Sequence, residues 1–337
     1  MSIPTSGLAA LEPVAAPVTP LVWLSLPARQ RTSRQQRLRR LAQILFFSLF
    51  VLAPVFDLLR YDLTRGHAYV LGFEWHLGLD DYFAKRISAR EVGWNIFLRL
   101  FLPAFGASFM LVAIAWRWGR IFCGWACPHF AVVEMINPLM ARTTGKLSLW
   151  DRKALPRLAP SRLWWWPTAF AVVVLSCIWA VALLTYALPP AEVYPRLLEF
   201  SLAPIPALFV AMVTLILSLE FLFARHLFCR YGCSLGLFQS LAWMMNRNAL
   251  VVGFERVRAS ACAACYAPDG PGDAACEIAC PMRLRPRVTK QQMFSCTQCG
   301  HCIDACPTVQ PKSLLRWLQG KAAQCNEARS ALMDRVI

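Results

Sequence analysis

The sequence predicts an α-helical membrane protein with four transmembrane helices, followed by a small domain rich in cysteine. Its 337 residues are 57% hydrophobic and only 16% charged, a composition too apolar for an ordinary soluble protein of this size. Four segments approach the roughly 20 apolar residues that are needed to cross a bilayer. They are Leu41–Leu59, Ile96–Trp116, Trp164–Leu188 and Ala203–Phe223. Eight of the 14 cysteines fall between residues 262 and 306, after the last of these segments.

The basic residues next to the predicted helices indicate which side of the membrane each end faces. Arginines dominate the stretch before the first helix, and Arg and Lys dominate the connection between the second and third. Because basic residues collect on the cytoplasmic side, we expect both termini and the cysteine-rich domain to be cytoplasmic. This topology accounts for the net charge of +16, so the expected partner is a lipid bilayer and not a nucleic acid.

These patterns divide the chain into four parts. Residues 1–40 are expected to form a basic N-terminal tail, and residues 41–248 the four-helix membrane domain. Residues 249–312 form the cysteine-rich domain, and residues 313–337 a C-terminal tail. Residues 1–28 lack the basic start that precedes the apolar core of a signal peptide, so we expect the first membrane helix to be retained.

Two cysteine pairs with C-x3-C spacing follow the second and fourth predicted helices. They are Cys123/Cys127 and Cys229/Cys233, and a segment with the pattern of an amphipathic helix follows each. This arrangement predicts an internal repeat of a two-helix hairpin plus a C-x3-C element. Residues four apart share one face of a helix, so the four thiols are expected to converge near the cytoplasmic surface.

Matched pairs of this kind favour a metal site or a redox-active thiol site. Soft sulfur ligands suit copper(I), zinc or iron–sulfur chemistry, and a reversible dithiol–disulfide relay is the other active interpretation. Cysteines that only pack helix ends are the alternative. That alternative applies better to the isolated Cys177 and Cys325.

The stretch CTQCGHCIDACP at residues 296–307 has the most specific spacing in the chain. Its C-x2-C-x2-C-x3-C-P pattern is that of a bacterial-type [4Fe–4S] ferredoxin. A related pattern precedes it, C-x2-C from Cys262, then ten residues, then C-x3-C-P from Cys276. A structural zinc site prefers two separated C-x2-C knuckles, and disulfides are disfavoured in the cytosol. We therefore predict a small α+β ferredoxin-like domain of the bacterial 2[4Fe–4S] type.

In two-cluster ferredoxins the fourth cysteine of each motif ligates the other cluster. This rule predicts a first cluster on Cys262, Cys265, Cys276 and Cys306. The second cluster is then predicted on Cys296, Cys299, Cys302 and Cys280. We interpret His301, between two of these ligands, as tuning the cluster or facing the surface rather than as a ligand.

Few other residues stand out. Glu220 is an acid inside the fourth predicted helix, and carboxylates within membranes are candidates for a quinone or proton site. No Gly-rich nucleotide loop, Ser/His/Asp set or HExxH element is present in the sequence. We therefore expect an electron-transfer component of an oxidoreductase system rather than an enzyme in its own right.

The combination resembles the NapH/NosR/CcoG group of membrane polyferredoxins. FCGWACP at residues 122–128 and FCRYGC at residues 228–233 are similar to the two membrane motifs of that group, and the resemblance covers about residues 40–312. The sequence departs from the group at Ser234, where a proline commonly follows the second cysteine. NosR-type proteins carry a large outer flavin domain, and CcoG-type proteins an immunoglobulin-like domain after the clusters. Only about thirty residues follow Cys306, so the compact NapH-like form is the expected match.

The resemblance implies a multi-pass protein of the bacterial cytoplasmic membrane. Such a protein would pass electrons between the quinone pool or cytoplasmic donors and a respiratory or periplasmic partner, such as a ferredoxin-type or cytochrome subunit. Its implied cofactors are two [4Fe–4S] clusters, with a quinone and a further metal at the C-x3-C pairs as additional candidates. The alternative is a CcoG-like factor that binds or reduces copper for assembly of a respiratory oxidase.

Overall fold

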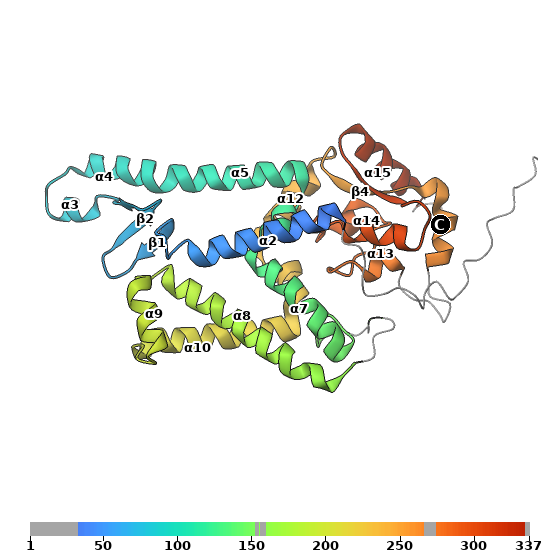
Figure 1. Cartoon of the computed structure of the whole chain (residues 1–337). Helices are drawn as coiled ribbons and strands as arrows, with labels where there is room; N and C mark the ends of the chain where they lie inside the picture. Colours follow the sequence, from blue (N-terminus) through green and yellow to red (C-terminus); the bar gives the residue numbers. More distant parts are fainter. Residues whose placement is uncertain (1–32, 152–154, 156–159, 266–273, 334–337) are drawn as a thin grey trace, which may run out of the picture.

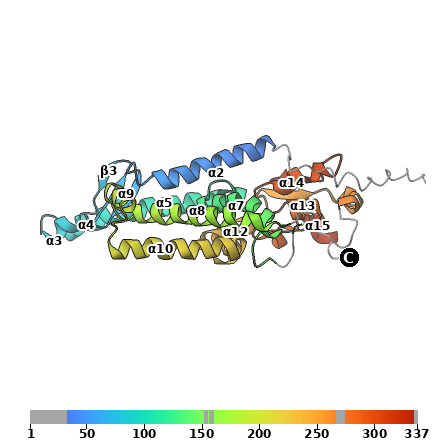
Figure 2. The same ribbon diagram turned by 60° about the horizontal axis from the view of Figure 1, so that its bottom comes forward.

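The computed structural model describes residues 33–151, 155, 160–265 and 274–333, so most of the expected N-terminal tail lies outside it. Four long helices extend between the two ends of the molecule (Figure 1). They are α2 (Arg34–Leu52), α5 (Leu102–Trp118), α8 (Trp165–Thr185) and α10 (Pro204–Leu219). Figure 2 shows α2 along one flank of this group and α10 along the opposite flank.

Three helical segments of the described residues are long and apolar enough to cross a membrane, Ala89–Trp118, Arg162–Thr185 and Pro204–Gly232. The first joins α4 (Ala89–Ile96), the π-helical η1 (Phe97–Phe101) and α5. The second adds the 3-10 turn η2 (Arg162–Trp164) to α8. The third continues α10 through η3 (Glu220–Ala224), α11 (Arg225–Leu227) and η4 (Phe228–Gly232). These segments correspond to the second, third and fourth predicted membrane helices.

The first predicted membrane helix, Leu41–Leu59, has different bounds in the structure. Helix α2 begins at Arg34, where the side chain of Ser33 caps it by accepting from the Gln36 amide, and it ends at Leu52. Leu59 already belongs to a strand. Pro54 explains the early end, because proline has no backbone N–H to continue the helical hydrogen bonds. Four of the first seven residues of α2 are arginines, and this charge distinguishes α2 from the three apolar segments.

A small antiparallel sheet lies at the end of the molecule opposite the cysteine-rich domain (Figure 1). Its strands are β1 (Leu59–Asp62), β2 (His67–Val70) and β3 (Phe73–Trp75), in the order β1-β2-β3. Helices α3 (Leu79–Phe83) and α9 (Pro190–Leu198) complete this end. These elements form the connections between the membrane helices on that side.

The cysteine-rich domain begins with β4 (Val251–Phe254) and contains short helices around its cysteines. These are η5 (Arg256–Cys265), α13 (Ala275–Ile278), η6 (Lys290–Met293), α14 (His301–Ala305) and η7 (Cys306–Thr308). The residues after 312 do not form the predicted separate tail. Strand β5 (Leu315–Leu318) pairs antiparallel with β4, and α15 (Lys321–Met333) follows it. The buried backbone of β4 needs a hydrogen-bonding partner, and the C-terminal residues supply it.

Three further helices lie between the membrane helices and this domain. They are α6 (Ile121–Trp125), α7 (Pro128–Thr144) and α12 (Ser234–Met245). Phe130 of α7 and Trp243 of α12 share one hydrophobic core with Val251, Leu314 and other residues of the cysteine-rich domain. The two parts are therefore packed as one body rather than joined by a loose linker.

The two parts approach each other closely at Gly124 in α6. A Cβ atom on Gly124 would lie 2.1 Å from the carbonyl oxygen of Thr297, in the loop that carries Cys296 and Cys299. The carbonyl of Gly124 accepts hydrogen bonds from Arg39 and Gln43 of α2, each 3.0 Å long. Next to it, the indole of Trp125 donates to the carbonyl of Gln298 at 3.2 Å.

We expect Gly124→Ala to destabilise the packing of the cysteine-rich domain on the membrane helices. The added methyl group meets backbone rather than a flexible side chain, so the free energy of unfolding should fall by roughly 1–3 kcal/mol, the usual cost of overpacking. The measurement is the Tm of the detergent-solubilised chain together with limited proteolysis. Gly106→Ala in α5 is the matched control, since a Cβ there meets nothing within 4 Å. Equal Tm values for the two variants would contradict the prediction.

Candidate functional site

Two small cavities in the cysteine-rich domain are each lined by four cysteines. Cys262, Cys265, Cys276 and Cys306 line the first, together with Phe254, Arg287 and Leu314. Cys280, Cys296, Cys299 and Cys302 line the second, together with Val252, Met282 and Thr297. The structure thus brings together the two sets of four that the crossed spacing rule predicts.

The four cysteine sulfurs of each set are arranged around a cavity, which suits an iron–sulfur cubane better than a single metal ion. Within the described part of the chain, no three His, Cys, Asp or Glu side chains come together in a way that suits one metal ion. Each set of four thiols instead surrounds a cavity, as the corners of a larger iron–sulfur cluster require. A bound cluster would supply one-electron redox chemistry. The protein would supply the thiolates, the apolar walls and the hydrogen bonds to sulfur.

Amide groups point at several of these sulfurs. The backbone N–H of Leu284 donates to Cys280 Sγ at 3.4 Å, and that of Leu314 to Cys306 Sγ at 3.3 Å. The side-chain amide of Gln310 donates to Cys265 Sγ at 3.1 Å. Hydrogen bonds of this kind favour the more negative, reduced state of a cluster.

The two C-x3-C pairs come together between α6, α7, η4 and α12. Cys123 and Cys229 are buried, and each is followed by a break in the helix, so the pairs do not share one continuous helical face as expected. The second cysteine of each pair is instead the N-cap of the next helix, with φ −68° and ψ 118° at Cys127 and φ −80° and ψ 105° at Cys233. Ser234 therefore takes the same first helical position as Pro128, and the missing proline leaves the local geometry similar.

The four thiols are close enough to act on one another electrostatically. Burial is the main cause that raises the pKa of Cys127, to about 11, and the Cys123 and Cys233 thiols act in the same direction. Burial also raises the pKa of Cys123, an effect that the charge of Arg120 opposes. We call the group as a whole the thiol tetrad (Cys123, Cys127, Cys229 and Cys233); burial favours the neutral thiol at Cys123 and Cys127.

Polar side chains that the sequence did not single out surround the thiol tetrad. Arg120 is 1% exposed and donates to the Cys229 carbonyl at 2.8 Å, but its Nε and Nη1 have no hydrogen-bond partner in the described residues. A buried guanidinium with unpaired donors is costly unless an anion lies nearby. Its position beside the thiols therefore suits a centre that carries negative charge.

Glu220, the predicted quinone or proton site, lies in η3 on the opposite side of the same group. Its carboxylate is 2.9 Å from Nε2 of His129, and Nδ1 of that ring is 3.7 Å from Cys229 Sγ. The structure therefore connects Glu220 with the thiol tetrad through His129. His129 follows Pro128 directly in the sequence, and only its position beside the C-x3-C pair hinted at a role.

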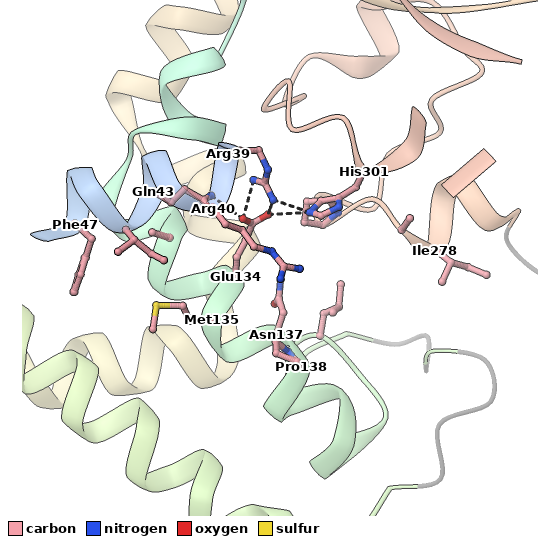
Figure 3. A pocket seen from close by; sticks show the side chains of 15 residues that line it. Arg39, Arg40, Gln43, Phe47, Glu134, Met135, Asn137, Pro138, Ile278 and His301 are labelled. Carbon is pink, nitrogen blue, oxygen red and sulfur yellow. Dashed lines mark hydrogen bonds and ion pairs between the residues drawn. The ribbon is translucent and has the colours of Figure 1, made fainter. Parts of the chain in front are cut away.

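A third polar group joins α2 to α7 and to the cysteine-rich domain. Arg39 forms an ion pair with Glu134 at 2.8 Å and donates to Nε2 of His301 at 2.8 Å (Figure 3). Burial acts to raise the pKa of Glu134, but its contact with His301 and the charge of Arg39 outweigh it and lower the pKa to about 2. Gln36 donates to the Cys299 carbonyl at 2.9 Å. The start of α2, predicted as part of a tail, thus contacts the second set of cysteines.

A family model described as a 4Fe-4S binding domain matches the chain twice, at residues 100–146 and 204–249. Each match covers one apolar helix (α5 or α10), a C-x3-C pair and the helix that follows. The matches therefore repeat one helix with its cysteine pair, and the predicted two-helix hairpin is not the repeating unit that they cover.

Several curated proteins are similar to the chain. It is 29% identical over 276 residues to the regulatory protein NosR of Pseudomonas aeruginosa, which covers 79% of this chain and 32% of NosR. It is 24% identical to the putative electron transport protein YccM of Escherichia coli (62% of this chain, 56% of YccM). It is 27% identical to the nitrogen fixation protein FixG of Rhizobium meliloti (61% of this chain, 40% of FixG). The chain spans about a third of the length of NosR, and no solved structure matches it.

We expect Gln310→Leu to lower the reduction potential of a cluster in the first cavity. The substitution removes the N–H···S bond to Cys265, and a hydrogen bond worth about 1 kcal/mol corresponds to roughly 40 mV for one electron. An EPR-monitored redox titration measures the shift, and a cluster in the second cavity serves as the internal reference. Gln324→Leu, at an exposed position in α15, is the matched control. An unchanged potential in the Gln310 variant would contradict the role of this hydrogen bond.

Proposed function

We propose that this chain is a membrane-associated iron–sulfur protein of the ferredoxin type, like its relatives NosR, YccM, RdxA and FixG. It would carry single electrons between the membrane and a redox partner through two [4Fe–4S] clusters. The observation that carries the proposal is the pair of cavities, each lined by four cysteines. An electron carrier needs such redox centres close to one another and close to its donor and acceptor.

The crossed ligation makes the two clusters neighbours. Cys276 lies in α13 and Cys280 just after it, and Cys302 lies in α14 and Cys306 directly after it. In each case the two residues line different cavities. Each of these short helices therefore connects both clusters. Electrons would pass from one cluster to the other within the domain and would need no movement of the chain.

The proposed orientation puts the clusters on the cytoplasmic side of a bacterial inner membrane. Helix α2 would be the fourth membrane helix, together with the three apolar segments. The arginines at its start, and Arg142 and Arg162 at the facing ends of α7 and η2, lie toward the end that carries the cysteine-rich domain, which is the distribution expected of a cytoplasmic face. The membrane-side donor or acceptor would be the quinone pool, and the other partner a ferredoxin-type or cytochrome subunit.

The decisive experiment follows the clusters spectroscopically in membranes that contain the chain and its native partners. Addition of a quinol should bleach the iron–sulfur absorbance, and dithionite should then complete the reduction. If dithionite reduces the clusters and quinol never does, the link to quinone is wrong, while the electron-carrier function stands with another donor.

A second candidate function is binding or reduction of copper for the assembly of a respiratory oxidase. The observation in its favour is the thiol tetrad, since two matched cysteine pairs converge beside the unpaired Arg120. Cysteine thiolates are soft ligands that favour copper(I). This function would use the clusters as the source of electrons for the metal.

We expect Cys306→Ser to damage the first cluster and Cys280→Ser to damage the second. In the crossed arrangement each serine removes a ligand from the cluster opposite its own motif. EPR spectra of the two clusters, with an iron content of about eight per chain in the unchanged protein, provide the readout. Loss of the second cluster alone in Cys306→Ser would refute the crossed ligation.

We expect Cys123→Ser and Cys229→Ser to abolish stoichiometric binding of copper(I) if the tetrad is a copper site. The measurement is a copper(I) titration of the purified chain against a chelator of known affinity. Cys177→Ser in α8 is the control, because Cys177 lies outside the tetrad and is a single thiol. Unchanged binding in both tetrad variants would remove the copper function and leave the electron-carrier proposal untouched.

A further inference from the structure

A cavity of about 530 Å³ lies between α2, α7 and the cysteine-rich domain (Figure 3). Its volume falls in the range of cavities that bind small molecules, about 300–1,000 Å³. Nothing in the electron path proposed above uses it. It is separate from the two cysteine-lined cavities and from the thiol tetrad.

One side of the cavity is polar and firmly held. Arg39, Glu134 and His301 converge there, and Gln43 donates to the Glu134 carboxylate at 2.7 Å (Figure 3). Arg39 is 1% exposed, so its charge is fixed in place rather than solvated. Asn137 also lines the cavity, and its buried Oδ1 has no hydrogen-bond partner in the described residues. The polar side therefore offers a carboxylate and a free amide oxygen as acceptors.

The remaining walls are apolar and continue into the membrane-facing surface of α2. Ile44, Phe47, Met135 and Ile278 are among the side chains that line them. On the same helix Leu41 is 62% exposed, as expected of a side chain in contact with lipid. A molecule that enters this cavity from the bilayer thus finds apolar walls first and the ion cluster at the end.

The second set of cysteines lies directly behind the cavity wall. His301 is between Cys299 and Cys302 in the sequence, and Ile278, Ala279 and Pro281 surround Cys280. Gln36, one helical turn before Arg39 and Arg40, contacts the Cys299 carbonyl. A ligand in the cavity would therefore be separated from the second cluster by little more than the residues that hold it.

We propose that this cavity binds the head group of a lipid-soluble quinol, and that Glu134 and Asn137 accept hydrogen bonds from its two hydroxyl groups. The inference deepens the proposed function and rests on it. On oxidation both O–H bonds of the quinol break, and its two electrons reduce the two clusters by one electron each. Its two protons leave toward the cytoplasmic water. The products are the quinone and two singly reduced clusters.

A phospholipid head group is the main competing occupant, because Arg39 and Arg40 both line the cavity. The charge of Arg39 is already paired with the carboxylate of Glu134, which would repel a phosphate. A neutral quinol that donates hydrogen bonds fits the same carboxylate without this cost. The arrangement of charge therefore favours the quinol.

The test uses the full chain with its clusters in native membranes and two adjacent substitutions on α2. Ile44→Trp places a large ring in the cavity, whereas Leu45→Trp changes a 67% exposed side chain that does not line it. We expect Ile44→Trp to slow reduction of the clusters by a short-chain quinol at least tenfold, with Leu45→Trp unchanged and dithionite reduction equal in both. Glu134→Gln keeps the shape of the site but removes its charge, and should raise the quinol concentration needed for half-maximal reduction.

An azidoquinone photoprobe gives a second readout that does not depend on electron transfer. Labelling of peptides from α2 or α7, displaced by unlabelled quinone, would support the site. Labelling near Glu220 instead, or equal reduction rates for the two tryptophan variants, would overturn it while leaving quinol as the donor. Displacement by phosphatidylglycerol vesicles alone would identify a phospholipid site and overturn the proposal. Labelling of the cavity in a protein that quinol never reduces would refute the redox step and the quinone link together.

Discussion

The backbone contact between Gly124 and Thr297 is the constraint on which the arrangement of the protein depends. Because position 124 has no side chain, the C-x3-C element of the membrane part touches the loop that carries Cys296 and Cys299 directly. The carbonyl of Gly124 also accepts hydrogen bonds from Arg39 and Gln43 of α2. One residue therefore fixes the mutual positions of the first helix, the first cysteine pair and one wall of the second cavity.

This contact has consequences for electron transfer. It brings three sulfur-rich groups, the two cavities and the thiol tetrad, into one packed body, with a shared core that runs from Phe130 and Trp243 to Leu314. Lys290 strengthens the same junction by donating to the last carbonyls of α12, at 2.6 Å to Trp243 and 2.8 Å to Asn246. Electron transfer between fixed centres needs no docking step, so the rigidity of this junction is itself part of the proposed function.

The sequence predicted what depends on local spacing and missed what depends on distant packing. The cysteine intervals were sufficient to divide eight residues into the two sets that line separate cavities, because a cubane imposes its own spacing on the chain. Arg39 and His301 are 262 positions apart, and no local pattern connects them. Membrane topology alone is enough to explain the arginines before the first predicted helix. The sequence therefore contained no indication that one of them, Arg39, is buried. Likewise β5 became visible only through its pairing with β4.

Buried cations explain how so much sulfur can be placed in one core. A cluster held by four thiolates carries net negative charge, and burying it requires compensation. The charge of Arg287 acts on Cys262, Cys265 and Cys276 of the first set, and that of Arg39 on Cys299 of the second. Arg120 acts on Cys296 and also on Cys123 of the tetrad. Arg287 thus serves the first set and Arg39 the second, whereas Arg120 serves both the second set and the tetrad. The charge of Arg120 therefore links the thiol tetrad to the second set of cysteines, in addition to their packing in one body.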